Sequence, residues 1–409
     1  MLATLIPIFD DTMMVRAYSV FAQKDNLLLT PRMAVGGMFD GATQVPGLEL
    51  VNAMGIDSDT LYADKEIFVE LTNVNIFSDI NSQYDGPREK IVLLLDHSIR
   101  PEEMYVKRIS ELKADGYKIA IRKITIPEFN TYRPIIMQAD YILLDHRKIN
   151  IANGRGILKR LYPEAGLCAV SVDSQEDYDM LKETGGYDLY EGGFFRLPVV
   201  DKERETAPLK MTYIELMNVV NDPDFNLDEA AGVIGRDTAL VLSLLEMVNH
   251  MTVNSEITSV QHAAAMLGQK ELRKWINTVV TKELCADRPS EVTRMSLLRA
   301  RFAENLAPIF ELGGFSQELF LMGLFSVLDI ILDKPIEECV KMVKLSKNIT
   351  DALVSDKGEF ATIYHLIKEY ENASWQEVSR IMVLNNISMD DVYNAYLDAQ
   401  KWYGNLVSV

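Results

Sequence analysis

The chain has 409 residues, a formal net charge of −19 and 48% hydrophobic residues. This length suffices for about two or three domains, and the composition excludes a disordered or collagen-like chain. The acidic charge repels a polyphosphate backbone, so we expect no nucleic acid among its partners. Cys168, Cys285 and Cys339 are widely spaced, which favours neither a disulfide framework nor a zinc site and fits a reducing cytoplasm.

The sequence also lacks membrane and export signals. No apolar run reaches the roughly 18 residues that a membrane helix needs. Residues 1–18 contain a short apolar run but neither a basic lead-in nor a cleavage-site pattern. We therefore expect a cytoplasmic protein without membrane insertion.

Over residues 1–200, short β-rich runs alternate with amphipathic segments. The runs are LIPIF, MMVRAYSVF, EIFVEL, KIVLLLD, KIAIRKI, YILLD, LCAVSV and YEGGFF. Several are almost continuously apolar, which is typical of parallel strands covered on both faces. About eight strands in this length favour a (β/α) barrel, with a doubly wound sheet as the alternative. The first two runs are too close for a crossover helix, which predicts an antiparallel hairpin around Asp10 to Met13.

The pattern changes at the charged segment VVDKERETAP, residues 199–208, which we interpret as a linker. Beyond it, apolar residues recur at spacings of three and four, which predicts helices with one buried face. Asn226 and Asp237 are candidate helix caps. We therefore predict two domains, an α/β domain over residues 1–200 and an all-α domain over residues 201–409.

The first half resembles the EAL-domain family. The resemblance lies in the order and spacing of IPIFDDTMMVRAYSVFAQ, FVEL, IVLLLD, GYKIAI, ADYILLD and DLYEGGFF. It implies a TIM-like barrel with an antiparallel first strand. In active members of that family, divalent metal held by carboxylates at the strand ends serves to hydrolyse cyclic di-GMP.

Most of the metal-binding and catalytic positions that this resemblance implies carry other residues. The replacements are Ser19 for the signature Glu, Gln23 for the phosphate-binding Arg, Glu70 for an Asn, Leu94 and Val170 for Glu, Leu143 for the catalytic Lys, and Arg122 and Lys123 for a paired Asp. Hydrolysis by this route needs several acidic ligands. The sequence therefore predicts a pseudoenzyme with no catalytic residue, no metal and no cofactor.

Five residues remain as candidates for ligand binding at the degenerate EAL site. Asp145, Asp173 and Glu191 keep an oxygen-bearing group where the resemblance implies one. Arg122 and Lys123 could contact a phosphate directly, which would give metal-free nucleotide binding. The plainer interpretation is that these are ordinary solvated residues at strand ends.

The second half resembles the HDOD domain, an all-helical relative of the HD phosphohydrolases. The resemblance rests on LMNVVNDPDFNLDEAAGVIGRDTALVLSLLEMVNH, ITSVQHAAAMLGQKELRKWI and LLRARFAENLA. HD enzymes use an adjacent His-Asp pair, yet no His in this chain is followed by Asp. His250, His262 and His365 fall on separate expected helices, so we interpret them as packing or surface residues. Asn249 and Gly268 match family positions, and we expect them to support the fold.

Together the two halves resemble bacterial EAL–HDOD signalling proteins. The sequence thus predicts a catalytically inactive signal-transduction protein that acts through protein–protein interaction with unidentified signalling proteins in a cyclic di-GMP-linked pathway. The alternative is a cyclic di-GMP receptor that binds the nucleotide without hydrolysing it. An active phosphodiesterase is the third, least favoured interpretation. The sequence leaves the oligomeric state open, with a homo-oligomer as one option.

Overall fold

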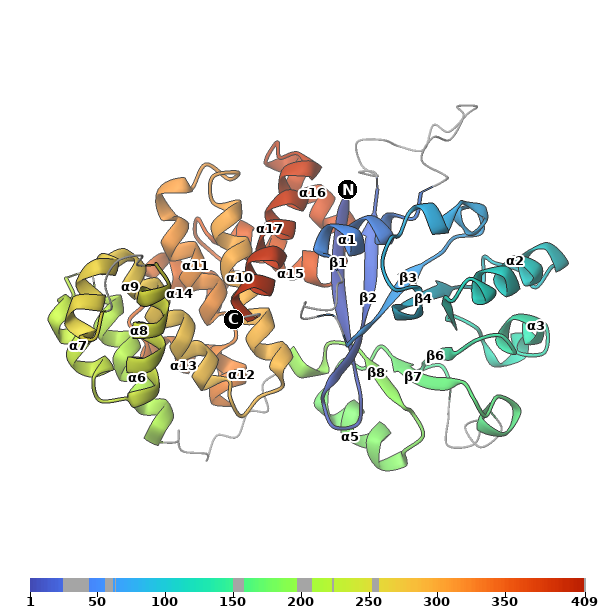
Figure 1. Ribbon diagram of the computed structural model, residues 1–409, viewed down its shortest axis with the longest axis horizontal. Coiled ribbons are helices and arrows are strands. Elements are labelled where there is room, and N and C mark those ends of the chain that lie inside the picture. Colours follow the sequence, from blue (N-terminus) through green and yellow to red (C-terminus); the bar gives the residue numbers. More distant parts are fainter. Residues whose placement is uncertain are drawn as a thin grey trace. The chain divides into compact units, whose positions relative to one another are not determined.

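The computed structural model describes residues 1–24, 44–55, 62, 64–149, 158–196, 208–222, 224–251 and 257–407. The chain forms two compact units, one of residues 1–197 with 365–409 and one of residues 198–364 (Figure 1). This division differs from the predicted boundaries, because the last segment belongs with the first unit. The predicted linker lies, except for Pro208, outside the described residues. No helix in these ranges is long and apolar enough to cross a membrane.

The first unit is built on a closed barrel of eight strands, which confirms the predicted fold class. The first strand is antiparallel to both of its neighbours, and the remaining pairs are parallel. The strands are β1 (Leu2–Phe9), β2 (Val15–Gln23), β3 (Glu66–Glu70), β4 (Ile91–Leu95), β5 (Lys118–Ile121), β6 (Tyr141–Asp145), β7 (Gly166–Val170) and β8 (Leu189–Glu191). The helices on the outside are α1 (Pro46–Met54), α2 (Glu103–Ala114), α3 (Arg133–Ile136) and α5 (Gln175–Thr184) (Figure 1).

The turn between β1 and β2 is organised by Asp10, which confirms the predicted hairpin. Its carboxylate accepts hydrogen bonds from the backbone amides of Thr12 at 2.8 Å and Met14 at 3.0 Å, and from Nε of Arg16 at 2.7 Å. Burial by itself raises the pKa of Asp10, but these hydrogen bonds outweigh that effect and lower it. The ionised carboxylate therefore holds the turn in place.

Apolar side chains fill the barrel interior. They are Ile8, Ala17, Phe68, Val92, Leu94, Ala120, Leu143, Cys168 and Leu189. At the amino end of the parallel strands, Glu66 pairs with Lys118 and accepts a hydrogen bond from the Tyr141 hydroxyl at 2.6 Å. The barrel is therefore a packed core closed at that end, and side chains at the opposite end remain for function.

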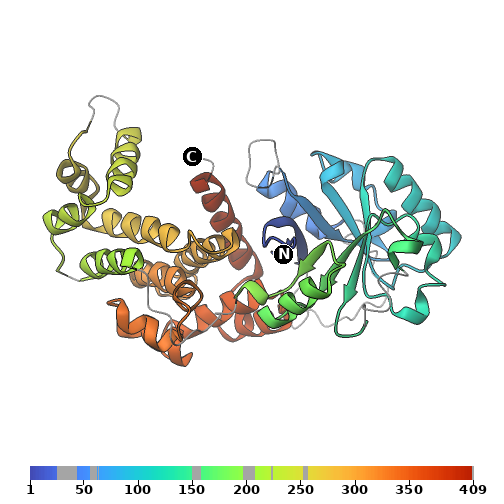
Figure 2. The same cartoon turned by 90° about the horizontal axis from the view of Figure 1, so that it is seen from below.

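Residues 365–409 cover one side of the barrel. Helices α15 (Ala361–Glu371), α16 (Trp375–Leu384) and α17 (Met389–Val407) end the chain, and α17 packs on β1 and α1 (Figures 1 and 2). In the described residues, β8 pairs with β1 only at Ile8 and Phe9. Further along, the Tyr370 hydroxyl accepts a bond from Ala3 N at 3.2 Å and donates one to Ala3 O at 3.0 Å. The tyrosine thus satisfies backbone groups of a strand that β8 is too short to pair.

A second set of buried hydrogen bonds fixes α17. Gln400 donates to the Tyr396 hydroxyl at 2.6 Å and accepts from the Tyr62 hydroxyl at 3.0 Å. Tyr396 also lies 3.2 Å from the Thr4 hydroxyl of β1. Because a hairpin replaces the usual crossover helix between the first two strands, the carboxy-terminal helices cover this side of the barrel instead. This is why the last segment belongs with the first unit.

The second unit is all-helical in its described residues. Its helices are α6 (Pro208–Asn221), α7 (Leu227–Ile234), α8 (Thr238–Met251), α9 (Val260–Leu284), α10 (Ser290–Leu306), α11 (Ser316–Phe325), α12 (Leu328–Leu332), α13 (Ile336–Met342) and α14 (Lys347–Ser355). The predicted caps are confirmed: Asn226 accepts from Asp228 N at 2.8 Å, and Asp237 accepts from Ala239 N at 2.9 Å. Gly268 has φ 70° and divides α9 at a kink, as its predicted turn role requires.

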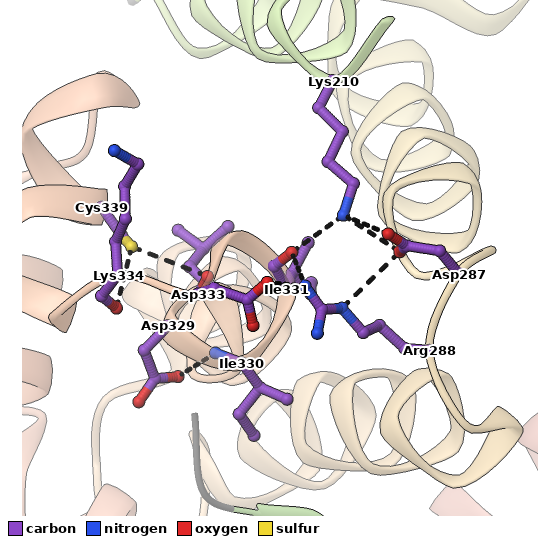
Figure 3. Close-up of polar contacts among 10 residues, drawn as sticks. Lys210, Asp287, Arg288, Asp329, Ile330, Ile331, Asp333, Lys334 and Cys339 are labelled. Carbon is purple, nitrogen blue, oxygen red and sulfur yellow. Dashed lines mark hydrogen bonds and ion pairs between the residues drawn. The ribbon is translucent and has the colours of Figure 1, made fainter. Parts of the chain in front are cut away.

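Two features hold this helical unit together. Helices α10 and α11 cross in backbone contact, since a Cβ atom on Gly323 would lie 2.5 Å from Ala300 N. Near the end of α12, Ile331 O accepts hydrogen bonds from Lys210 Nζ and Arg288 Nη2, both at 2.9 Å (Figure 3). Arg288 also binds Asp333 at 2.6 Å. The two cations stabilise this carbonyl in the last turn of α12 and tie the helix to α6 and to the segment between α9 and α10.

Candidate functional site at the carboxyl end of the barrel

The candidate site lies where the parallel strands end. Strands β2 to β8 run in one direction, so their carboxyl ends open on the same end of the barrel, where (β/α) barrels place their active sites. Charged residues occupy or directly follow five of these ends: Glu70, Asp96, Arg122 with Lys123, Asp145, and Glu191. All five predicted site residues belong to this end.

Arg122 forms the centre of one group. Its Nη2 donates to Glu70 Oε1 at 2.5 Å, and its guanidinium carbon lies 5.3 Å from the centre of the Phe21 ring. Arg122 is only 9% exposed, and within the described residues its buried Nε has no hydrogen-bond partner. Buried donors in folded proteins almost always have a partner, so an unsatisfied Nε at the mouth of the barrel is an exception.

Glu191 faces the same group from β8. It accepts a hydrogen bond at 2.7 Å from the hydroxyl of Ser19, the residue at the position of the signature Glu. Burial raises the pKa of Glu191, and the Ser19 hydrogen bond and the charge of Arg122 offset this only in part. A carboxyl with a raised pKa can carry a proton nearer neutral pH than an ordinary glutamate.

Lys123 points to a different partner. Its ammonium lies 3.6 Å from Asp96, which directly follows β4. Burial by itself raises the pKa of Asp96, but hydrogen bonds from Ser98 and the charge of Lys123 lower it. Lys123 has φ 60° and Ser171, directly after β7, has φ 63°. Such strained backbone in non-glycine residues is common at binding sites.

Asp145 and Asp173 are joined by a cation that the sequence analysis did not select. Arg147 lies 3.3 Å from Asp145 and 3.1 Å from Asp173, and Lys148 lies 3.3 Å from Asp145. Burial by itself raises the pKa of Asp145, but its bonds with Arg147 and Lys148 outweigh this and lower it. Asp145 is therefore an ionised carboxylate between two cations.

The structure thus sorts the predicted residues into separate contacts. Burial raises the pKa of Glu191 and the charge of Arg122 offsets this in part. Arg147 forms ion pairs with both Asp145 and Asp173, and Lys123 forms an ion pair with Asp96. The sequence analysis missed four contributors, namely Phe21, Asp96, Arg147 and Lys148. Asp96 had a local signal, because it ends the run IVLLLD, and Arg147 lies two residues after a candidate; Phe21 had none, because its role depends on closure of the barrel.

The EAL resemblance implies a divalent metal at these strand ends. Among the described residues, no three His, Cys, Asp or Glu side chains lie together in a way that could hold a metal ion. Leu94 and Leu143 fill the interior at two of the implied positions, and Arg122 adds a positive charge beside Glu70. The residues present do not fit a divalent cation, and we assign no chemical step to one.

The helical unit has a groove of about 470 Å³ along α8. The residues that line it are Leu242, Leu245, Glu246, Asn249, His250, Ile257 and Thr258. Asn249 donates to Ile257 O at 3.0 Å and accepts from Ile257 N at 2.7 Å, which confirms its predicted bond to neighbouring backbone. His250 and His262 are exposed on separate helices, and His365, in the other unit, lies 3.2 Å from Glu377.

The model of the HDOD domain family matches residues 207–364. This segment is therefore an HDOD domain, and it follows a barrel whose first strand is antiparallel. Both findings confirm the predicted fold class, a (β/α) barrel with an antiparallel first strand followed by an all-helical HDOD domain.

Two relatives resemble most of the chain. The cyclic di-GMP phosphodiesterase CdgJ of Vibrio cholerae serotype O1 is 27% identical over 77% of this chain and 74% of its own length. The uncharacterized protein YuxH of Bacillus subtilis is 26% identical over 90% of this chain and 91% of its own. A solved structure of the EAL enzyme Bd1971, with cAMP and cyclic di-GMP bound, has a TM-score of 0.37 and 12% identity over 46% of this chain. The chain spans 60% of the length of that structure.

The likeness to CdgJ contradicts the prediction that the chain is a pseudoenzyme, because that relative is named as a phosphodiesterase. The prediction rested on counting replaced positions one by one. Such a count does not weigh carboxylates that replace other residue types or that come from uncounted positions at the same end of the barrel. Glu70, in place of an Asn, and Asp96 are two such groups.

Proposed function

We propose that this chain works in cyclic di-GMP signalling and binds the cyclic dinucleotide at the carboxyl end of its barrel. The observation that carries this proposal is the set of four cations that follow two neighbouring strands, Arg122 and Lys123 directly after β5 and Arg147 and Lys148 two and three residues after the end of β6. A cyclic dinucleotide carries two phosphodiester groups, each with one negative charge. Arginine forks and lysine ammonium groups are the side chains that bind such groups best.

The solvent exposure and the ion pairing of these cations support the proposal. Lys123 is 54% and Arg147 55% exposed in its side chain, so a phosphate can reach them. Each is paired with a carboxylate that holds it at the strand end without burying it. The neighbouring Arg122 adds a buried guanidinium whose Nε has no hydrogen-bond partner in the part of the chain that the structure describes. The name of the relative CdgJ supports the same ligand.

A second candidate function is hydrolysis of cyclic di-GMP, which the name of CdgJ favours. The site offers groups for general acid–base chemistry. Asp96 and Asp145, kept ionised by their lowered pKa, would orient an attacking water by accepting its hydrogen bonds. Glu191, with raised pKa, would donate a proton to the leaving oxygen as the ring P–O bond breaks, and the proton of the water would pass to solvent. Such a reaction would open the ring to a linear dinucleotide.

The test is a calorimetric titration of the full chain with cyclic di-GMP, followed by chromatography of the recovered nucleotide. We expect saturable binding, weakened about tenfold or more in Arg147→Ala through loss of a charge-assisted contact. Lys159→Ala is the matched control, because Lys159 binds Asp188 at the amino end of β8. Recovery of a linear product would establish the second candidate. Absence of saturable binding would overturn the proposal for the barrel.

We further propose that the HDOD domain passes the signal to protein partners in the cytoplasm. Leu242, 56% exposed beside the α8 groove, and the exposed Met251 support a contact surface, and three unpaired cysteines suit a reducing compartment. We expect the full chain to retain a partner whose amount changes with added cyclic di-GMP. Leu242→Glu should abolish retention, and Leu384→Glu, at a 69% exposed apolar residue of the barrel unit, should not. Equal retention by both variants would contradict this surface.

A further inference from the structure

The Arg122 guanidinium lies at the mouth of the barrel, bonded to one carboxylate and close enough to a second for its charge to act on it. It reaches from the end of β5 to Glu70 at the end of β3, and its charge also acts on Glu191 from β8. The strand between β3 and β5, β4, presents only the apolar Val92 and Leu94 to the interior. One fixed positive charge therefore serves acidic groups from two sides of the barrel.

A divalent cation would compete for this same place. To use Glu70 and Glu191 as ligands it would have to lie against the guanidinium, and like charges in a partly buried site repel strongly. Glu70 is already bonded to Arg122 at 2.5 Å. The guanidinium also packs on the Phe21 ring, a contact that favours an organic cation over a hydrated metal ion.

The guanidinium has capacity left for a ligand. Its Nε is buried and, among the described residues, has no hydrogen-bond partner. This nitrogen is itself buried, so a phosphodiester oxygen satisfies it only when side chains at the barrel mouth move aside, whereas the side chain as a whole keeps 11% of its surface exposed to a ligand. A metal ion would not satisfy this donor, because it offers no acceptor.

We propose that Arg122 replaces a divalent cation at the barrel mouth, so that the chain binds the phosphodiester of a cyclic dinucleotide without a metal ion. This inference rests on the proposed nucleotide binding. It adds that the cation which neutralises the phosphate is part of the chain itself.

The first experiment compares calorimetric titrations of the full chain with cyclic di-GMP in excess EDTA and in excess Mg²⁺. We expect the same affinity in both. Arg122→Gln should lose about tenfold to a hundredfold in affinity, because it removes the charge and the free donor. Lys159→Ala should bind as the wild type does. Binding that disappears in EDTA would overturn the proposal.

The second experiment uses Mn²⁺ alone, followed by its electron paramagnetic resonance signal, so that it does not depend on nucleotide binding. We expect no saturable Mn²⁺ binding by the wild type, and a gain of binding in Arg122→Asp, which places a third carboxylate near Glu70 and Glu191. Saturable binding by the wild type, or a folded Arg122→Asp variant without such a gain, would overturn the proposal. If thermal melting shows that Arg122→Asp is unfolded, the proposal is tested by the affinity of Arg122→Gln and by the comparison of EDTA with Mg²⁺ in the first experiment. A wild type that binds neither nucleotide nor Mn²⁺ would refute the proposed function while leaving Arg122→Asp as the test of the cation position.

Discussion

Replacement of Tyr370 by phenylalanine tests how the end of the chain holds the barrel. The tyrosine is fully buried, and its hydroxyl makes two hydrogen bonds to the backbone of Ala3. Tyr370→Phe removes both bonds at a place that water does not reach. At about 1–3 kcal/mol for each of the two unsatisfied groups, we expect a loss of roughly 2–6 kcal/mol in the free energy of unfolding. For a unit of this size that corresponds to a fall of roughly 4–24 °C in melting temperature.

The assay is urea unfolding of the full chain, with the transition of the barrel unit followed separately from that of the HDOD domain. Tyr105→Phe is the matched control, because its hydroxyl makes one exposed bond of 3.3 Å to Asn73 O. We expect the control to change stability by less than about 0.5 kcal/mol. A Tyr370→Phe barrel as stable as the control would refute the view that residues 365–409 complete the barrel.

Three further predictions, one of them with a matched control variant, concern the packing and the titrating groups. Gly323→Ala should destabilise the HDOD domain by about 1–3 kcal/mol or more, because the added methyl group meets the backbone of α10. Gly232→Ala, with no atom within 4 Å of the added methyl group, should be neutral or stabilising by as much as about 1 kcal/mol, and similar denaturant midpoints for both would contradict the close crossing. Asp10→Asn should destabilise at neutral pH and lose this effect as pH falls below 3.8 through the lowered pKa of Asp10; an effect that persists in acid would argue against a charged turn. The raised pKa of Glu191 means that wild-type stability falls as pH rises above 4.5. In thermal melts at increasing pH, Glu191→Gln should therefore become more stable relative to the wild type. A difference in melting temperature that stays constant with pH would contradict the raised pKa.

The barrel could be predicted from sequence because its signals are local. Eight short apolar runs and the short gap at Asp10 to Met13 fix the number of strands and the first hairpin. The placement of residues 365–409 could not be predicted in this way. The amphipathic pattern of α17 shows that one face is buried, but it does not show that this face packs on β1.

The candidate site was predictable only as a set of strand-end residues. Arg122, Asp145 and Glu191 follow or end strands, and parallel strands bring such residues to one end. Their partners depend on closure of the barrel, which brings Phe21 of β2 and Glu70 of β3 against Arg122 of β5. The prediction of a pseudoenzyme was wrong because it rested only on the number of replaced ligand positions. It did not consider the charged side chains that other strands place at the same end of the barrel.

The most direct measurement of the proposed function is hydrogen–deuterium exchange of the full chain with and without saturating cyclic di-GMP. We expect added protection at the segments that follow β3, β5 and β6, including residues 122–126 and 145–149 at the carboxyl end of the barrel. Segments at the opposite end, such as the residues around Lys159 and Asp188, should exchange as before. No protection at saturating nucleotide, or protection confined to the amino end of the strands or to residues 208–364, would contradict nucleotide binding at the barrel mouth.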